Sequence, residues 1–156
     1  MILSIPYHTA LVFYEENTTN IKAYLPMDKG EKFEIIFKHS IHLTDVSEKY
    51  VITDNLNIKQ YEMVYEEFGI GMPSNAEGTE ELVYKQGKYH LTNINNIFSS
   101  INLRNGKTVS EHRLTWVDKE KHMIWLNQYF QPGSWFTVKV EKLSLWQLMK
   151  GERIRD

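Results

Sequence analysis

The chain has 156 residues, no cysteine and a formal net charge of −2. This length indicates one domain that is large enough to bury a hydrophobic core, and the lack of cysteine excludes disulfides, thiolate metal sites and a cysteine nucleophile. The charge balance offers no basic surface for nucleic acid, and no run of about 20 apolar residues is present that would span a membrane.

Short apolar segments separated by turn residues recur along the chain and predict β-strands. In chain order, the expected strands cover residues 10–14, 21–25, 33–39, 46–52, 56–65, 82–84, 89–92, 98–103, 112–117, 123–126 and 136–141. About ten short antiparallel strands with frequent turns are typical of an all-β fold, either a single-domain sandwich or a partly open barrel. We expect the core to span residues 10–142, and residues 143–156 to form a C-terminal extension that begins with a short helix.

Glycines mark two bends between these strands. Gly69 and Gly71, followed by Pro73, predict a tight structural turn that needs positive φ; the third glycine and the helix of a dinucleotide fingerprint are missing. Asn105-Gly106 is the strongest hairpin signal in the chain, and it predicts a turn that joins the strands on either side.

Residues 33–52 read as two alternating strands joined by a polar loop, and each apolar face ends in one ionisable residue. Pairing Phe37 with Tyr50 brings His39 opposite Glu48 on the inner face. Directly opposed side chains in such a hairpin have Cβ atoms roughly 4.5–5.5 Å apart. Because a buried carboxylate needs a partner, we predict an inward-facing His39–Glu48 pair.

His39, Glu48 and His112 all lie on strand faces that are otherwise apolar, and they form the candidate polar cluster. Three such side chains could hold a divalent metal, or they could be a satisfied cluster that only fixes strand register; the second interpretation is favoured. His39 and His42 do not make a zinc-protease motif, because the glutamate is absent and the two would point opposite ways on a strand. The same alternation places Ser40 badly for deprotonation by His39.

Four segments resemble the domain-of-unknown-function family 1850, in matching order and spacing over roughly Ala10 to Lys142. They are KHSIHLTDVSEKY, EEFGIGMP, SEHRL and FQPGSWFTVKVEK. The family pattern carries over to His39, Ser40, Glu48, Gly69, Gly71, Glu111 and His112. The resemblance implies small extracytoplasmic bacterial proteins behind an N-terminal hydrophobic anchor, often encoded beside TRAP transporters of the TAXI branch.

We therefore expect a binding or accessory module at the cell membrane or cell surface, without a cofactor, whose partner is a transporter component or that transporter's solute. The alternatives are a metal-dependent enzyme built on the candidate polar cluster and a purely structural interaction domain. The apolar start, Met1 to Pro6, is either an ordinary first strand or the stub of a membrane anchor, and membrane contact is expected only through such an anchor.

Overall fold

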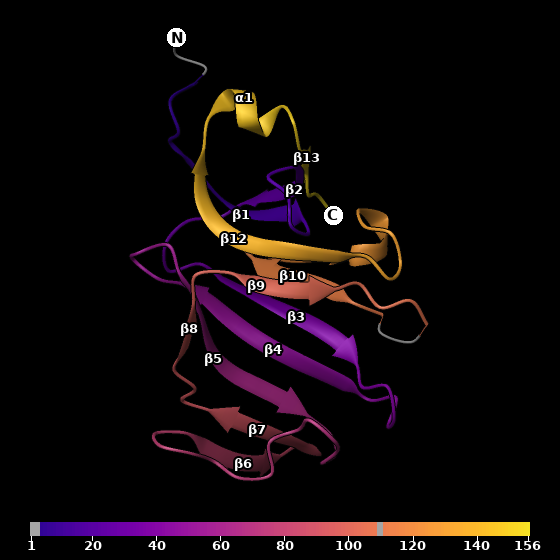
Figure 1. Ribbon diagram of the computed structural model, residues 1–156. Helices are drawn as coiled ribbons and strands as arrows, with labels where there is room; N and C mark the ends of the chain where they lie inside the picture. Colours follow the sequence, from indigo (N-terminus) through magenta and orange to yellow (C-terminus); the bar gives the residue numbers. More distant parts are fainter. Residues whose placement is uncertain (1–3, 109–110) are drawn as a thin grey trace.

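The computed structural model describes residues 4–108 and 111–156, and this part of the chain forms two β-sheets (Figure 1). The first sheet has the order β13 (Glu152–Arg153), β2 (Ile21–Pro26), β1 (His8–Glu15), β12 (Trp135–Leu143) and β9 (Ile101–Arg104). The second has the order β11 (Lys121–Trp125), β10 (Arg113–Val117), β3 (Lys32–Lys38), β4 (Asp45–Ile52), β5 (Ile58–Tyr65), β7 (Lys88–Thr92) and β6 (Glu81–Lys85), with β8 (Asn96–Phe98) paired to β5.

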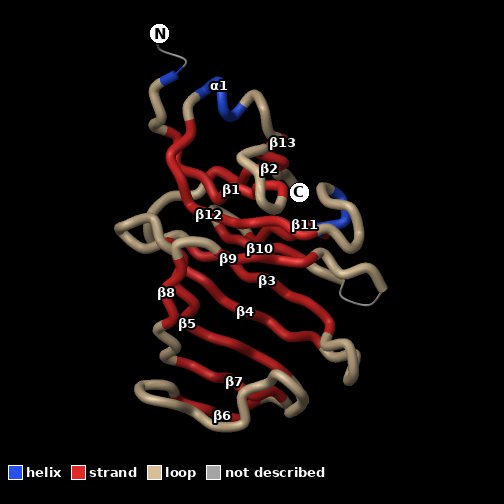
Figure 2. The backbone as a smooth tube through the Cα atoms, viewed as in Figure 1, coloured by secondary structure: helices blue, strands red, loops and turns tan. Residues whose placement is uncertain are grey.

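The fold is an all-β sandwich and not a closed barrel, which confirms the predicted class. All strand pairs among the described residues are antiparallel except that of β13 with β2. The expected C-terminal helix is present as a single turn, α1 (Leu145–Leu148), and a 3-10 turn covers Leu126–Gln128. Figure 2 shows that β7 and β6 lie at the end of the second sheet farthest from the first sheet.

One hydrophobic core joins the inner faces of the two sheets. Phe13 and Val138 contribute from the first sheet, and Ile35 and Leu114 from the second. Full burial of such a side chain stabilises the fold by about 1.5–3 kcal/mol relative to exposure. Ile154 is also part of this core, so the core continues beyond the boundary predicted at residue 142.

The predicted register of the β3–β4 hairpin is wrong by four residues. Glu48 lies opposite Ile35 rather than His39, and Phe33 lies opposite Tyr50, with their rings stacked at 5.2 Å between centroids. A slip by an even number of residues leaves every side chain on the same face. The alternation therefore predicted the inward faces correctly but could not select the register, and the predicted His39–Glu48 pair does not form.

The prediction of a hairpin at Asn105-Gly106 is also wrong. Strand β9 belongs to the first sheet and β10 to the second, so the connection crosses between sheets. Asn105 is buried, and its amide nitrogen donates to Asn127 Oδ1 at 2.8 Å and to the carbonyl oxygen of Phe130 at 3.0 Å. A buried side-chain amide that binds a neighbouring loop has replaced the expected turn.

The start of the chain lies partly outside the described residues, which exclude Met1 to Leu3. Strand β1 begins at His8, and residues 4–7 belong to no strand. No helix in the described part of the chain is long and apolar enough to cross a lipid bilayer.

Candidate functional site

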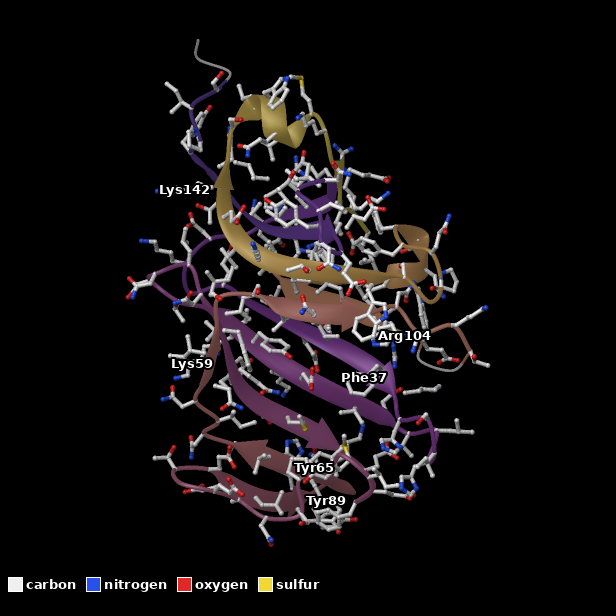
Figure 3. The ribbon with its side chains drawn as sticks, in the orientation of Figure 1. Phe37, Lys59, Tyr65, Tyr89, Arg104 and Lys142 are labelled. Carbon is white, nitrogen blue, oxygen red and sulfur yellow. The ribbon has the colours of Figure 1, made fainter. Side chains whose placement is uncertain are left out.

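Two loops meet at one end of the second sheet, and we call them the paired loops: residues 39–44, which join β3 to β4, and residues 66–73, which follow β5. In Figure 3, Phe37 labels the end of β3, and Tyr65 labels the end of β5. Of the predicted polar residues, His39 and Ser40 thus lie on one of the paired loops, and the predicted glycine bend, which is distant in sequence, lies on the other.

His39 joins the two loops through one ring nitrogen and braces its own loop through the other. Its Nδ1 lies 3.3 Å from the backbone nitrogen of Ile41 and 3.4 Å from that of His42, which both donate to it. Nε2 must then carry the hydrogen, which it donates to the carbonyl oxygen of Ile70 at 3.2 Å. Because both nitrogens are engaged by backbone groups and the side chain is only 8% exposed, His39 is not placed to deprotonate Ser40.

Gly69 is required by close approach rather than by its φ angle. A Cβ atom at this position would lie 2.7 Å from Nε2 of His42 and 3.3 Å from Cε1 of His39. Gly71 has a φ of +86°, which satisfies the predicted need for positive φ, and the hydroxyl of Tyr65 donates to the carbonyl oxygen of Pro73. The glycine bend thus packs its backbone directly against the two histidine rings.

His42 is the site residue that the sequence interpretation missed. Its ring stacks on that of His39 with 5.1 Å between centroids, and its Nδ1 lies 2.9 Å from Oε2 of Glu67 on the other loop. The expected strand over residues 33–39, if continued through His42, would point the two histidines apart. Both instead lie in the loop of residues 39–44, where their rings stack.

The tips of the paired loops present apolar side chains to solvent. Ile70 is 84% exposed, Ile41 60%, Leu43 57% and Phe68 43%. Leu43 also has a φ of +56°, a conformation that costs a bulky L-residue about 1–2 kcal/mol. Strained backbone of this kind often marks a functional position, and here it turns an apolar side chain outward.

Glu48 lies on the inner face of β4 without a histidine partner. Its Oε2 accepts a hydrogen bond of 2.8 Å from the hydroxyl of Tyr50. Burial raises the pKa of the Glu48 carboxyl, and burial together with the neighbouring carboxyl raises the pKa of the Tyr50 hydroxyl. The pair is a satisfied polar contact at the edge of the core.

Glu111 and His112 approach the site from the two positions that directly precede β10, the strand next to β3. Oε2 of Glu111 lies 3.3 Å from Nζ of Lys38, and the ring of His112 stacks on Phe37 with 5.5 Å between centroids. Burial lowers the pKa of His112 to about 4. Both residues therefore support the base of the paired loops rather than their exposed tips.

The structure does not bring His39, Glu48 and His112 together as a metal site. Within residues 4–108 and 111–156, no three His, Asp or Glu side chains are grouped closely enough to hold a metal ion. The reason is the register: His39 leaves the sheet, Glu48 pairs with Tyr50, and His112 packs on Phe37. The grouping on which the enzyme alternative depended is absent, while a binding role for the individual residues stays a prediction.

The fold and the site together define an all-β sandwich with a pair of loops that contact each other at their base and expose apolar side chains at their tips. Residues 33–123 match the model of a family described as "Domain of unknown function (DUF1850)", and because this is more than half of the chain, the protein belongs to that family. The match includes both paired loops, Glu111 and His112, but it leaves out β1, β2 and β12 of the first sheet. No curated protein and no solved structure matches the chain.

Proposed function

We propose that this protein is an extracytoplasmic accessory protein, at the cell membrane or cell surface, that binds a component of a TRAP/TAXI-type solute transporter through its paired loops. The observation that carries the binding role is the exposure of Ile41, Leu43, Phe68 and Ile70 on loops that are fixed from beneath. The transporter partner and the compartment are supported by the family resemblance of these same loop segments.

The contacts below the tips favour a preformed binding surface. Hydrogen bonds from His39, the close packing of Gly69 and the His42–Glu67 contact hold the loops together. A loop that is ordered before it binds avoids much of the entropy that association otherwise costs. Four apolar side chains that move from water into a partner's groove each supply up to about 1.5–3 kcal/mol.

The shape of the site favours a protein partner over the transported solute. The apolar side chains protrude from the loop tips, whereas small-molecule sites are concave. The charged side chain of Glu67 lies next to the exposed Phe68, which fits the arrangement of an apolar centre with a polar rim that protein interfaces use. The expected partner surface is an apolar groove bordered by polar groups.

The test is direct binding to the purified membrane subunit of a TAXI-type transporter from the genome that encodes this chain. We expect Ile70→Glu to weaken binding at least about tenfold, because it places a charge in the centre of the interface. Ile97→Glu is the matched control, since Ile97 is 55% exposed on β8, away from the loops. Absence of binding, or equal weakening by the two variants, would overturn the proposal.

A further inference from the structure

A second candidate binding site lies on the other sheet, and it does not depend on the proposed function. A cleft of about 930 Å³ opens over β1 and β12. Its floor carries Tyr14, Thr137, Lys139 and Glu141, which alternate along the strands with residues of the hydrophobic core. One wall is the turn at residues 17–20, and the other is α1 and the residues after it, which Figure 1 shows above β1 and β12.

The floor of this cleft is a fixed polar surface. The hydroxyl of Tyr14 donates to Oε2 of Glu141 at 2.6 Å, and Nζ of Lys139 lies 5.8 Å from the centroid of the Tyr14 ring. Burial, followed by the hydrogen bond to Glu141, raises the pKa of the Tyr14 hydroxyl. The carboxylate is therefore oriented by a neutral phenol, and it keeps a second oxygen that can accept hydrogen bonds from a ligand.

The rim of the cleft adds an exposed aromatic ring and a second cation. Trp146 is 53% exposed, and the Nζ of Lys150 lies 3.4 Å from the centroid of its ring. The helical turn that carries Trp146 is capped by Ser144 and Gln147, which bond each other's backbone and side chain. The indole is thus presented by an ordered element rather than by a free loop.

The chemistry of these groups points to one ligand class. An indole face packs against the C–H surface of a pyranose ring, while amide, hydroxyl, carboxylate and ammonium groups bond its hydroxyls. The residues that line the cleft include two ammonium groups, Lys139 and Lys150, and one carboxylate, Glu141, so the lining has a net charge of +1. We infer that this cleft binds a saccharide that carries an acidic group, with Trp146 as the stacking platform and Lys150 as the partner of the acid.

The position of Lys150 suggests how such a ligand would enter. A cation–π contact with an exposed ring is worth about 0.5–1 kcal/mol, whereas a charge-assisted hydrogen bond to an anion is stronger. The acidic group draws the Lys150 ammonium away from the indole, which uncovers the ring for the sugar. Binding should therefore change the fluorescence of Trp146 as well as release heat.

The acidic group could be a carboxylate or a phosphate, and the experiment separates the two. Galacturonic acid oligomers, phosphomannan and neutral chitin oligomers are titrated into the full chain by calorimetry and tryptophan fluorescence. We expect at least one acidic probe to bind about tenfold or more tightly than the neutral one, and Trp146→Ala and Lys150→Met each to weaken it about tenfold. Binding of the galacturonic acid oligomer would identify the acidic group of the ligand as a carboxylate, and binding of phosphomannan would identify it as a phosphate.

Trp135→Ala is the matched control. Trp135 is 46% exposed on β12, the strand that forms part of the cleft floor, but it lies outside the cleft. Thermal unfolding of each variant checks that it folds. We expect each tryptophan variant to fold, because both tryptophans are exposed and contribute little to the core. Binding of neither acidic probe would overturn the inference. So would equal affinity for the neutral probe, or equal weakening by Trp135→Ala and Trp146→Ala.

Discussion

His39 donates a hydrogen bond of 3.2 Å from Nε2 to the carbonyl oxygen of Ile70, which lies 31 residues further along the chain. This bond joins the buried base of one loop to the most exposed tip residue of the other. The side chain of His39 therefore connects the hydrogen-bonded base of the loops to an exposed apolar tip.

Replacing His39 with alanine should destabilise the fold and loosen both loops. The change leaves the backbone nitrogens of Ile41 and His42 without their acceptor, and removal of one partner from a part-buried hydrogen bond costs about 1–3 kcal/mol. Chemical denaturation should report this loss, and amide exchange should be faster at Ile41 and His42. Ser40→Ala is the control, because Ser40 is exposed; equal stability of the two variants would contradict a structural role for His39.

Adding one methyl group at Gly69 should displace the ring of His42. The new Cβ would lie 2.7 Å from Nε2 of His42, and overpacking of this kind costs about 1–3 kcal/mol. The measurement is a double-mutant cycle with Gly69→Ala and His42→Ala. The second change removes the clashing ring, so Gly69→Ala should be better tolerated in the His42→Ala background; a purely additive result would mean that the two residues do not collide.

The all-β class and the inward faces of strands such as β3 and β12 were predictable because they depend on local alternation of buried and exposed residues. Residues such as Phe136, Val138 and Val140 are buried as that pattern requires. The register of β3 and β4 was not predictable, since any even slip keeps Ile35 and its neighbours on the same face. Loop length decides between such registers, and nothing in an alternating pattern reports where the loop begins.

The candidate site could be predicted only in part, for a related reason. His39 and Gly69 stood out as residue types, but their contact depends on two loops that are distant in sequence and meet only in the folded chain. The strand pattern of residues 33–39 does not indicate that His42 contacts His39, because that contact forms within a loop. The Asn105-Gly106 pair predicts a turn, but the amide of Asn105 bonds a different loop. The local sequence thus indicated which residues to consider, whereas the residues that they contact are determined by tertiary packing.

Leu43→Gly should raise stability while it weakens partner binding. Glycine adopts the φ of +56° without the penalty that leucine has, although it loses more backbone entropy on folding. We expect a net gain of up to about 1 kcal/mol in the free energy of unfolding, with lower affinity for the partner because an apolar tip is lost.

Leu56→Gly is the contrast, since Leu56 has a φ of +59° but packs against the core. This variant should destabilise the fold, because it removes a side chain that the core needs. Unchanged partner affinity in Leu43→Gly would exclude Leu43 from the interface.

His112 should make the protein less stable in mild acid. Burial lowers the pKa of His112 to about 4 in the folded state, whereas the pKa of an unperturbed histidine is about 6.5. The unfolded chain therefore takes up the proton first as the pH falls. The stability that the neutral His112 ring contributes is fully present above about pH 6.5 and is lost progressively between about pH 6.5 and 4.

The measurement is the difference in melting temperature between the wild type and His112→Gln across this range. Taking the difference cancels the titration of the groups that both proteins share. The difference should shift in favour of the variant as the pH falls, because glutamine does not titrate; a difference that stays constant from pH 7 to 4 would show that His112 is not buried as a neutral ring.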